Sequence, residues 1–164
     1  MQRITLLCVG KLKEKFYAEA VAEYAKRLSR YCKLEIVELA EERLPEAPSP
    51  AQVERALLKE AEAVRRKIPP SSRLIALCVE GRLRSSEELA RTMAAWASGA
   101  EQGLEKRLVF LIGGSFGLHE SLKAEAWAKL SMSPMTFPHH LARVMLLEQI
   151  YRAYQINGGT KYHK

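Results

Sequence analysis

The sequence predicts an α/β fold in which a parallel sheet is covered by helices on both faces. Short apolar runs alternate along the chain with segments of helical periodicity, and glycines or prolines lie at several of the boundaries. No internal repeat or low-complexity tract interrupts this alternation. The 164 residues are 48% hydrophobic and 27% charged, which fits one globular domain over residues 1–164.

Five apolar runs are expected to form the strands of this sheet. The fourth run is the most apolar of the five, so we expect it at the centre of the sheet, where both of its faces are buried. Ligands of such sheets bind beyond the carboxyl ends of the strands, so the loops after the third and fourth runs are the places to seek chemistry. The expected strands are residues 4–9, 34–39, 74–79, 108–112 and 130–132.

Five segments between and after these runs have helical features. Phe16 and Leu28 belong to an apolar stripe in the first segment, and Ser85 with Glu88 fits a capping box that opens the third. Pro138 suits the start of the last helix, in which Glu148 and Arg152 are spaced as an ion pair. The expected helices are residues 16–31, 51–67, 85–98, 118–128 and 138–156. The apolar residues expected to be buried in the last helix are Leu141, Val144, Met145, Ile150 and Tyr151.

Charge is distributed unevenly along the chain, whose formal net charge is +7. Residues 1–33 hold eight basic and three acidic side chains, whereas residues 34–63 hold three basic and eight acidic ones. This separation indicates one surface suited to a polyanion and another that is merely solvated. All the acidic residues are glutamates, which excludes an aspartate-led calcium loop, a Walker-B aspartate and the usual Ser-His-Asp triad.

The cysteines indicate neither a zinc site nor a disulfide framework. Cys8, Cys32 and Cys78 are odd in number and widely spaced, and each lies in or beside an expected strand, where a buried free thiol is the ordinary interpretation. We expect no bound metal. The first apolar run is too short for a signal peptide and no stretch is long enough to span a membrane, so a cytoplasmic protein is expected.

The loop after the fourth strand, Gly113-Gly114-Ser115-Phe116-Gly117, allows three interpretations. It matches the G-x-S-x-G pattern of serine hydrolases, although the acid would have to be a glutamate such as Glu120 or Glu125. It also fits a tight turn that needs glycine, or a loop whose bare backbone approaches an adenine-bearing ligand. The dinucleotide and phosphate-loop patterns are not met, because position 115 is serine and no Gly-Lys-Ser/Thr follows.

A second unusual segment lies between Pro134 and Pro138. The two prolines hold Met135, Thr136 and Phe137 in an irregular loop, since each proline disfavours helix in the residue before it. This loop either lines an adenine pocket with polar contacts from the backbone, or is simply a packed connection.

Several segments together resemble one known family. These are Val9-Gly-Lys-Leu-Lys-Glu14, Ile112-Gly-Gly-Ser-Phe-Gly-Leu118, Met135-Thr-Phe-Pro-His139, the pattern Arg143-Val…Glu148-Gln…Tyr151-Arg-Ala153, and the terminal Tyr162-His-Lys164. From end to end the chain resembles the ribosomal RNA large subunit methyltransferase H family of the SPOUT superfamily. The combination is far more specific than any single motif.

The resemblance implies both a fold and an activity. The carboxyl-terminal part of the sheet would be tied in a deep trefoil knot, a rare exception to unknotted chains. The enzyme would use S-adenosylmethionine to methylate N3 of a pseudouridine in 23S rRNA within the assembled ribosome, as a homodimer with its site at the subunit junction. The cofactor contacts carried over by position are Leu77, Gly113, Met132, Ser133, Pro134, Met135, Thr136 and Phe137.

The end of a chain is ordinarily disordered, and it is the resemblance that implies a role for this carboxyl-terminal tail. His163 and Tyr162 are the candidates for handling the proton of the acceptor nitrogen, and Arg143 and Arg152 for stabilising its negative charge. The RNA would bind the basic end of the chain, at Lys11, Lys13, Lys15, Lys26, Arg27 and Arg30. A serine hydrolase and a non-catalytic basic RNA-binding protein are the alternative functions.

Overall fold

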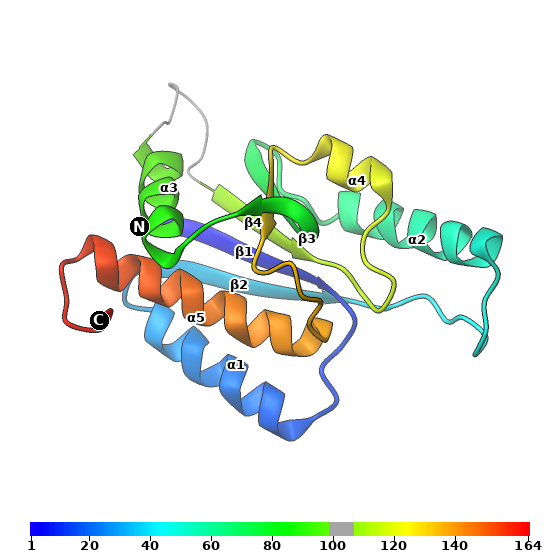
Figure 1. The fold of residues 1–164 in the computed structure, drawn as a ribbon, viewed down its shortest axis with the longest axis horizontal. Helices are drawn as coiled ribbons and strands as arrows, with labels where there is room; N and C mark the ends of the chain where they lie inside the picture. The colour runs from blue at the N-terminus through cyan, green and yellow to red at the C-terminus, as the bar shows by residue number, and fades with distance from the viewer. Residues whose placement is uncertain (99–106) are drawn as a thin grey trace.

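The computed structural model describes residues 1–98 and 107–164, and within them the strands form one five-stranded parallel sheet (Figure 1). The strand order is β2-β1-β4-β3-β5, and each neighbouring pair is parallel. The predicted parallel sheet is therefore confirmed, with β4 in the middle. The strands are β1 (Gln2–Val9), β2 (Cys32–Leu39), β3 (Ser72–Leu83), β4 (Arg107–Ile112) and β5 (Ala128–Ser131).

Helices cover both faces of the sheet, as predicted (Figure 1). One face is covered by α1 (Lys15–Leu28), α3 (Ser86–Ser98) and α5 (His139–Asn157), and α5 packs against the other two. The opposite face is covered by α2 (Pro50–Arg65) and α4 (Glu120–Glu125). The Ser85–Glu88 capping box is formed at the start of α3 by two reciprocal hydrogen bonds of 2.7 and 3.1 Å.

The side chains of the central strands alternate between two buried clusters. In β1, Leu6 and Cys8 pack beneath α1, α3 and α5, whereas Leu7 and Val9 pack beneath α2 and α4. Residues 108–112 of β4 alternate in the same way and are all buried. This is the period of two that a strand covered on both sides requires, and it explains why the runs read as continuously apolar.

Strand β3 is longer than predicted, because it continues past a register shift and pairs with β5 twice. Leu77 pairs with Leu130, and after the shift Arg82 pairs with the same residue. Gly81 lies at this second approach, where a Cβ atom would be 2.6 Å from the carbonyl carbon of Leu130. Only glycine allows two backbones to come so close. The trefoil knot itself stays a prediction.

Two details of helix packing differ from the expected apolar stripes. Phe16 is exposed, and the buried residues of α1 are Val21 and Leu28. In α5 the buried side includes Arg143, because that guanidinium finds polar partners in the interior. Of the five apolar residues of α5 that were expected to be buried, only Ile150 is buried, and the four that stay partly exposed are Leu141, Val144, Met145 and Tyr151. Helix α4 is shorter than expected, since Ala126 is already extended.

Candidate active site

A pocket of about 540 Å³ lies at the carboxyl end of β4 and beside the second half of β3, close to the edge where a parallel sheet is expected to bind its ligand. Its wall comes from residues 77–80 of β3, the glycine loop after β4, and the segment between β5 and α5. Of the cofactor-contact candidates, those that line it are Leu77, Gly113, Met132, Ser133, Met135, Thr136 and Phe137. Pro134 is the one candidate that does not line it.

The glycine loop is a tight turn as well as a pocket wall. The amide of Gly117 donates to the carbonyl of Gly114 over 3.0 Å, and Gly117 has a φ of 79°. A Cβ atom at Gly113 would lie 2.5 Å from the backbone of Gly117. The glycines are therefore needed for the turn, and the same bare backbone faces the pocket at positions 113, 114 and 117.

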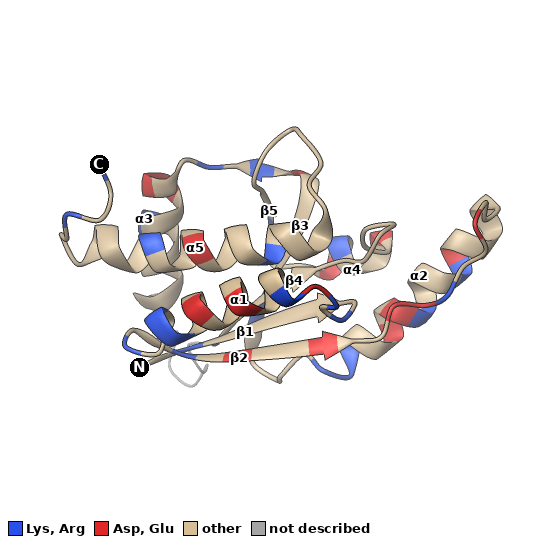
Figure 2. Cartoon of the chain, turned by 90° about the horizontal axis from the view of Figure 1, so that it is seen from below, with Lys and Arg blue, Asp and Glu red and all other residues tan. Residues whose placement is uncertain are grey.

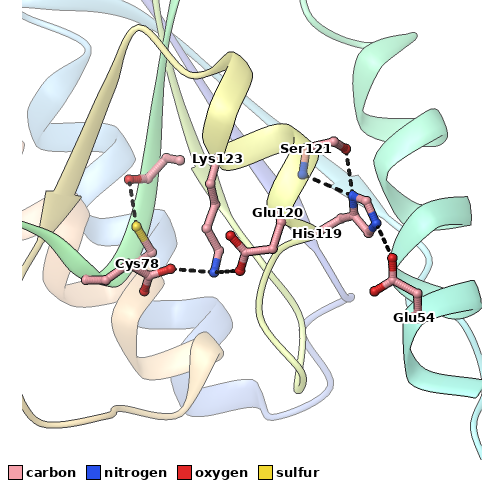
Figure 3. Close-up of polar contacts among 8 residues, drawn as sticks. Glu54, Cys78, His119, Glu120, Ser121 and Lys123 are labelled. Atoms are coloured by element: carbon pink, nitrogen blue, oxygen red, sulfur yellow. Dashed lines mark hydrogen bonds and ion pairs between the residues drawn. The ribbon is translucent and has the colours of Figure 1, made fainter. Parts of the chain in front are cut away.

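Two charged side chains in the pocket wall were not expected from the sequence (Figure 3). The ammonium of Lys123 donates to Glu80 and, over 3.0 Å, to Glu120. The hydrogen bond from Lys123 holds the pKa of Glu80 below its ordinary value. Burial by itself would lower the pKa of Lys123, but its two carboxylate partners outweigh burial and raise it. At neutral pH the pocket therefore carries a fixed carboxylate beside a fixed ammonium.

His139 begins α5 and also lines the pocket. Burial, followed by the charge of the neighbouring His140, lowers the pKa of His139 from its ordinary value. Its imidazole is therefore mainly neutral at pH 7. Its Nε2 atom lies 3.9 Å from Oε2 of Glu41, which comes from the loop after β2.

The serine of the G-x-S-x-G match is not part of a hydrolase arrangement. The amide of Ser115 donates to Glu41, and among the described residues no histidine contacts its hydroxyl. A Ser-His-Glu chain does occur elsewhere: Ser121 lies 2.6 Å from Nδ1 of His119, whose Nε2 lies 2.7 Å from Glu54 (Figure 3). None of these three residues lines the pocket, and the chain instead ties α4 to α2.

The candidate catalytic residues of the tail form one cluster. Arg152 donates to Glu148 over 2.6 Å and lies 3.2 Å from Nδ1 of His163. The hydroxyl of Tyr162 donates to Glu148 over 3.1 Å, and Nε2 of His163 lies 2.8 Å from Glu87 of α3. The structure thus brings Arg152, Tyr162 and His163 together, and the predicted Glu148–Arg152 pair is formed.

This cluster does not reach the pocket within one chain. Arg152 lies 14 residues beyond Pro138 in sequence, which corresponds to about 20 Å along a helix. Arg143 is separate again: its guanidinium is 1% exposed and donates to Glu38 over 2.6 Å and to the carbonyl of Gly10 over 3.0 Å. The four catalytic candidates therefore occupy two places.

In the part of the chain that the structure describes, no group of three or more histidine, cysteine or acidic side chains could hold a metal ion. Cys8 and Cys32 are buried free thiols and Cys78 is partly buried at the pocket. None of the described helices is both long and apolar enough to cross a membrane.

Comparison with known proteins decides the family. A family model described as "Predicted SPOUT methyltransferase" matches residues 2–163, nearly the whole chain. The chain belongs to the SPOUT methyltransferase family. As a methyltransferase, it requires a methyl donor.

Relatives of this SPOUT methyltransferase support the same assignment. It is 47% identical over 161 residues to the ribosomal RNA large subunit methyltransferase H of Clostridioides difficile (strain 630), covering 98% of this chain and 99% of the relative. The protein of that name from Bifidobacterium adolescentis is 48% identical over 164 residues, covering 99% of each chain. A solved structure titled as a "probable methylase family protein" from Haemophilus influenzae Rd KW20 shares the fold, with a TM-score of 0.51 and 13% identity. It covers 99% of this chain and 70% of that one.

Three pocket residues of this SPOUT methyltransferase, Glu80, Lys123 and His139, received no role in the sequence analysis. A fourth residue, Glu41, lies outside the pocket lining but contacts two of the lining residues, Ser115 and His139. Lys123 and Glu80 are 43 residues apart, and Glu41 and Ser115 are 74 apart. No local sequence pattern predicts these contacts, because they join segments that are distant in the sequence and meet only in the folded chain.

Proposed function

We propose that this enzyme transfers a methyl group from S-adenosylmethionine to N3 of a pseudouridine in the 23S rRNA of the large ribosomal subunit. The observation that carries the proposal is the convergence of the three predicted cofactor segments on one pocket. The curated relatives, which are named as ribosomal RNA large subunit methyltransferases, supply the class of substrate.

The pocket suits an adenine-bearing cation in size and chemistry. Its volume of about 540 Å³ lies within the range of about 300–1,000 Å³ that small-molecule sites occupy. Leu77, Met132 and Phe137 offer apolar surface to a base, and the bare glycine backbone offers hydrogen bonds. The carboxylate of Glu80 offers attraction to a positive charge.

The donor, when bound, supplies a methyl group already activated on a sulfonium. The protein therefore has to hold that group in line with the acceptor nitrogen and to exclude water. The residues that would do so are the cofactor contacts Leu77, Gly113, Met132, Ser133, Pro134, Met135, Thr136 and Phe137.

The acceptor nitrogen must lose a proton, and we assign this step to the tail. Burial and the hydrogen bond to Glu148 raise the pKa of Tyr162, so its hydroxyl stays protonated at neutral pH and does not act as the base, while its single proton is donated to Glu148. His163 is then the candidate proton acceptor, and Arg152 stabilises the charge on the ring oxygens. Arg143, buried beneath the pocket-side end of α5, acts through the loops that it binds.

A homodimer would bring the pocket of one chain next to the carboxyl-terminal tail of the other. Because the tail lies at the far end of α5 from the pocket of its own chain, a partner subunit would have to supply it. The partly exposed apolar residues of α5, Leu141, Val144 and Met145, are available to such a partner. Sedimentation should then give twice the mass of the chain, and mixing a pocket variant with a tail variant should restore part of the activity.

The RNA would meet the exposed basic residues of the β1–α1 loop, α1 and the turn after α1, namely Lys11, Lys13, Lys15, Lys26, Arg27 and Arg30. We propose that the shape of the assembled ribosome contributes to recognition, because folded RNA is recognised largely by its shape. A cytoplasmic location follows from this substrate.

The test is to incubate the protein with labelled S-adenosylmethionine and ribosomes that lack the modification, and then to map the labelled nucleoside by nuclease digestion and mass spectrometry. We expect the label on N3 of one pseudouridine in 23S rRNA. Label on another atom or another RNA would contradict the proposal.

His163→Ala should slow single-turnover methylation at least ten-fold, whereas Lys161→Ala, an exposed neighbour, should not.

A further inference from the structure

Glu41 makes a contact that joins the glycine loop to a distant part of the chain. It follows β2, the edge strand, and its Oε1 accepts a hydrogen bond of 2.6 Å from the amide of Ser115. A Cβ atom at Gly114 would lie 2.6 Å from that same oxygen. The missing side chain at position 114 therefore makes room for the carboxylate of Glu41.

The second oxygen of Glu41 faces another wall of the pocket. Oε2 lies 3.9 Å from Nε2 of His139, the first residue of α5. Gly10, with a φ of 104°, borders both groups: a Cβ atom there would lie 3.2 Å from His139 and 3.6 Å from Glu41. One carboxylate thus lies among three loops, those after β1, after β4 and before α5.

The glycine loop needs such a support more than an ordinary loop does. Glycines have the widest backbone freedom, so a loop with glycines at 113, 114 and 117 loses much entropy when it is fixed. A hydrogen bond from an amide to a carboxylate is about twice as strong as one between neutral groups. The side chain of Glu41 is 28% exposed, so water only partly weakens this bond.

We infer that Glu41 is a positioning residue for the methyl donor: it holds the glycine loop and the start of α5 in the shape that binds the donor. This inference rests on the proposed function, because it concerns the same pocket. Glu41 is not among the residues that line the pocket, so it acts through Ser115, Gly114 and His139.

The experiment compares Glu41→Ala, Glu41→Gln and Glu46→Gln with the unaltered protein. Glu46 is an exposed glutamate of the same connection and is the matched control. Calorimetry with S-adenosylmethionine alone gives the donor Kd, and methylation of ribosomes at varied donor concentration separates KM from kcat. Hydrogen exchange at the Ser115 amide reports the hydrogen bond itself.

Glu41→Ala should raise the donor Kd and KM about ten-fold and speed exchange at Ser115. The kcat at saturating donor and the KM for ribosomes should stay within two-fold. Glu41→Gln should recover most of the donor affinity, because its amide oxygen still accepts the same N–H, and Glu46→Gln should change nothing. The inference is overturned if Glu41→Ala binds the donor as the unaltered protein does, or if glutamine fails to restore affinity. An unaltered protein that does not bind the donor would overturn the proposed function as well.

Discussion

Arg143 is the most deeply buried charged side chain among the described residues, at 1% exposure. Its guanidinium links α5 to the ends of β1 and β2 through Gly10 and Glu38. Removing Arg143 leaves the carboxylate of Glu38 without its partner, but that side chain is 35% exposed, so water compensates part of the loss and the cost is below that of a fully buried pair. We therefore expect Arg143→Ala to lower the free energy of unfolding by about 1–3 kcal/mol in urea titrations, whereas Arg30→Ala on the surface changes it by less than about 0.5 kcal/mol.

The partner of Arg143 makes stability depend on pH. Burial would raise the pKa of Glu38, but the hydrogen bonds from Arg143 and from the amide of Leu12 outweigh it and lower the pKa below 4.5. A lowered folded-state pKa gives stability that is complete above the unfolded value and is lost as pH falls through the folded one. We expect the gap in unfolding free energy between the unaltered protein and Glu38→Gln to shrink as the pH falls below about 4.5. A gap that does not change between pH 7 and pH 3 would refute this.

Among the elements, the double approach of β3 to β5 is the feature most sensitive to substitution. At Gly81 a methyl group would meet backbone atoms of Leu130 and Ser131 at 2.6–2.8 Å, and backbone cannot swing aside as a side chain can. Gly81→Ala should therefore lower the unfolding free energy by about 3 kcal/mol, the upper end for overpacking. Gly158→Ala is the control, because its Cβ atom would meet nothing closer than 3.2 Å.

Helix α4 depends on a polar tie to α2 (Figure 3). The hydroxyl of Ser121 accepts from Arg65 over 2.6 Å and contacts His119, so Ser121→Ala leaves both without this partner. We expect Ser121→Ala to lower the free energy of unfolding by about 1–2 kcal/mol in thermal unfolding, with the donor Kd unchanged.

A fluorophosphonate probe should label neither Ser115 nor Ser121, and labelling of either would favour the hydrolase alternative.

Element boundaries could be predicted where a local signal marks them. The Ser85 capping box and Pro138 set the starts of α3 and α5 to within one residue. The continuation of β3 could not be predicted, because residues 80–83 become a strand only by pairing with β5. The exposure of Phe16 could not be predicted for a similar reason. Helical periodicity shows which residues share one side of a helix, but tertiary packing decides how far along the helix that side is covered.

At the scale of the whole molecule, basic and acidic residues are unevenly distributed along the chain (Figure 2). The connection from β2 to α2 carries acidic residues, and basic residues mark the β1–α1 loop and the carboxyl-terminal tail. We expect ribosomal RNA affinity to fall with salt, with a log–log slope of about −0.7 to −0.9 for each phosphate neutralised. Replacing Lys11 and Lys13 by alanine should make the slope shallower by about one to two units. An unchanged slope would place the RNA elsewhere.

That the three cofactor segments would meet in one pocket could be predicted from the sequence, whereas the charged residues in and beside that pocket could not. Parallel strands end at one edge, so loops with unusual glycines and prolines after β3, β4 and β5 were expected to meet there. Glu41 follows β2, one of the two edge strands of the sheet. Lys123 lies on α4, which covers the face of the sheet that α2 also covers. Their roles depend on contacts between distant segments, which only the folded chain defines.

The most direct test of this account is a crystal structure of the protein with S-adenosylmethionine bound. The adenine is expected between Leu77 and the 132–137 segment, with the backbone of Gly113 within hydrogen-bond distance and the sulfonium facing the open side of the pocket. A donor bound at any other place, or no binding at millimolar concentration, would contradict the assignment of this pocket and the mechanism built on it.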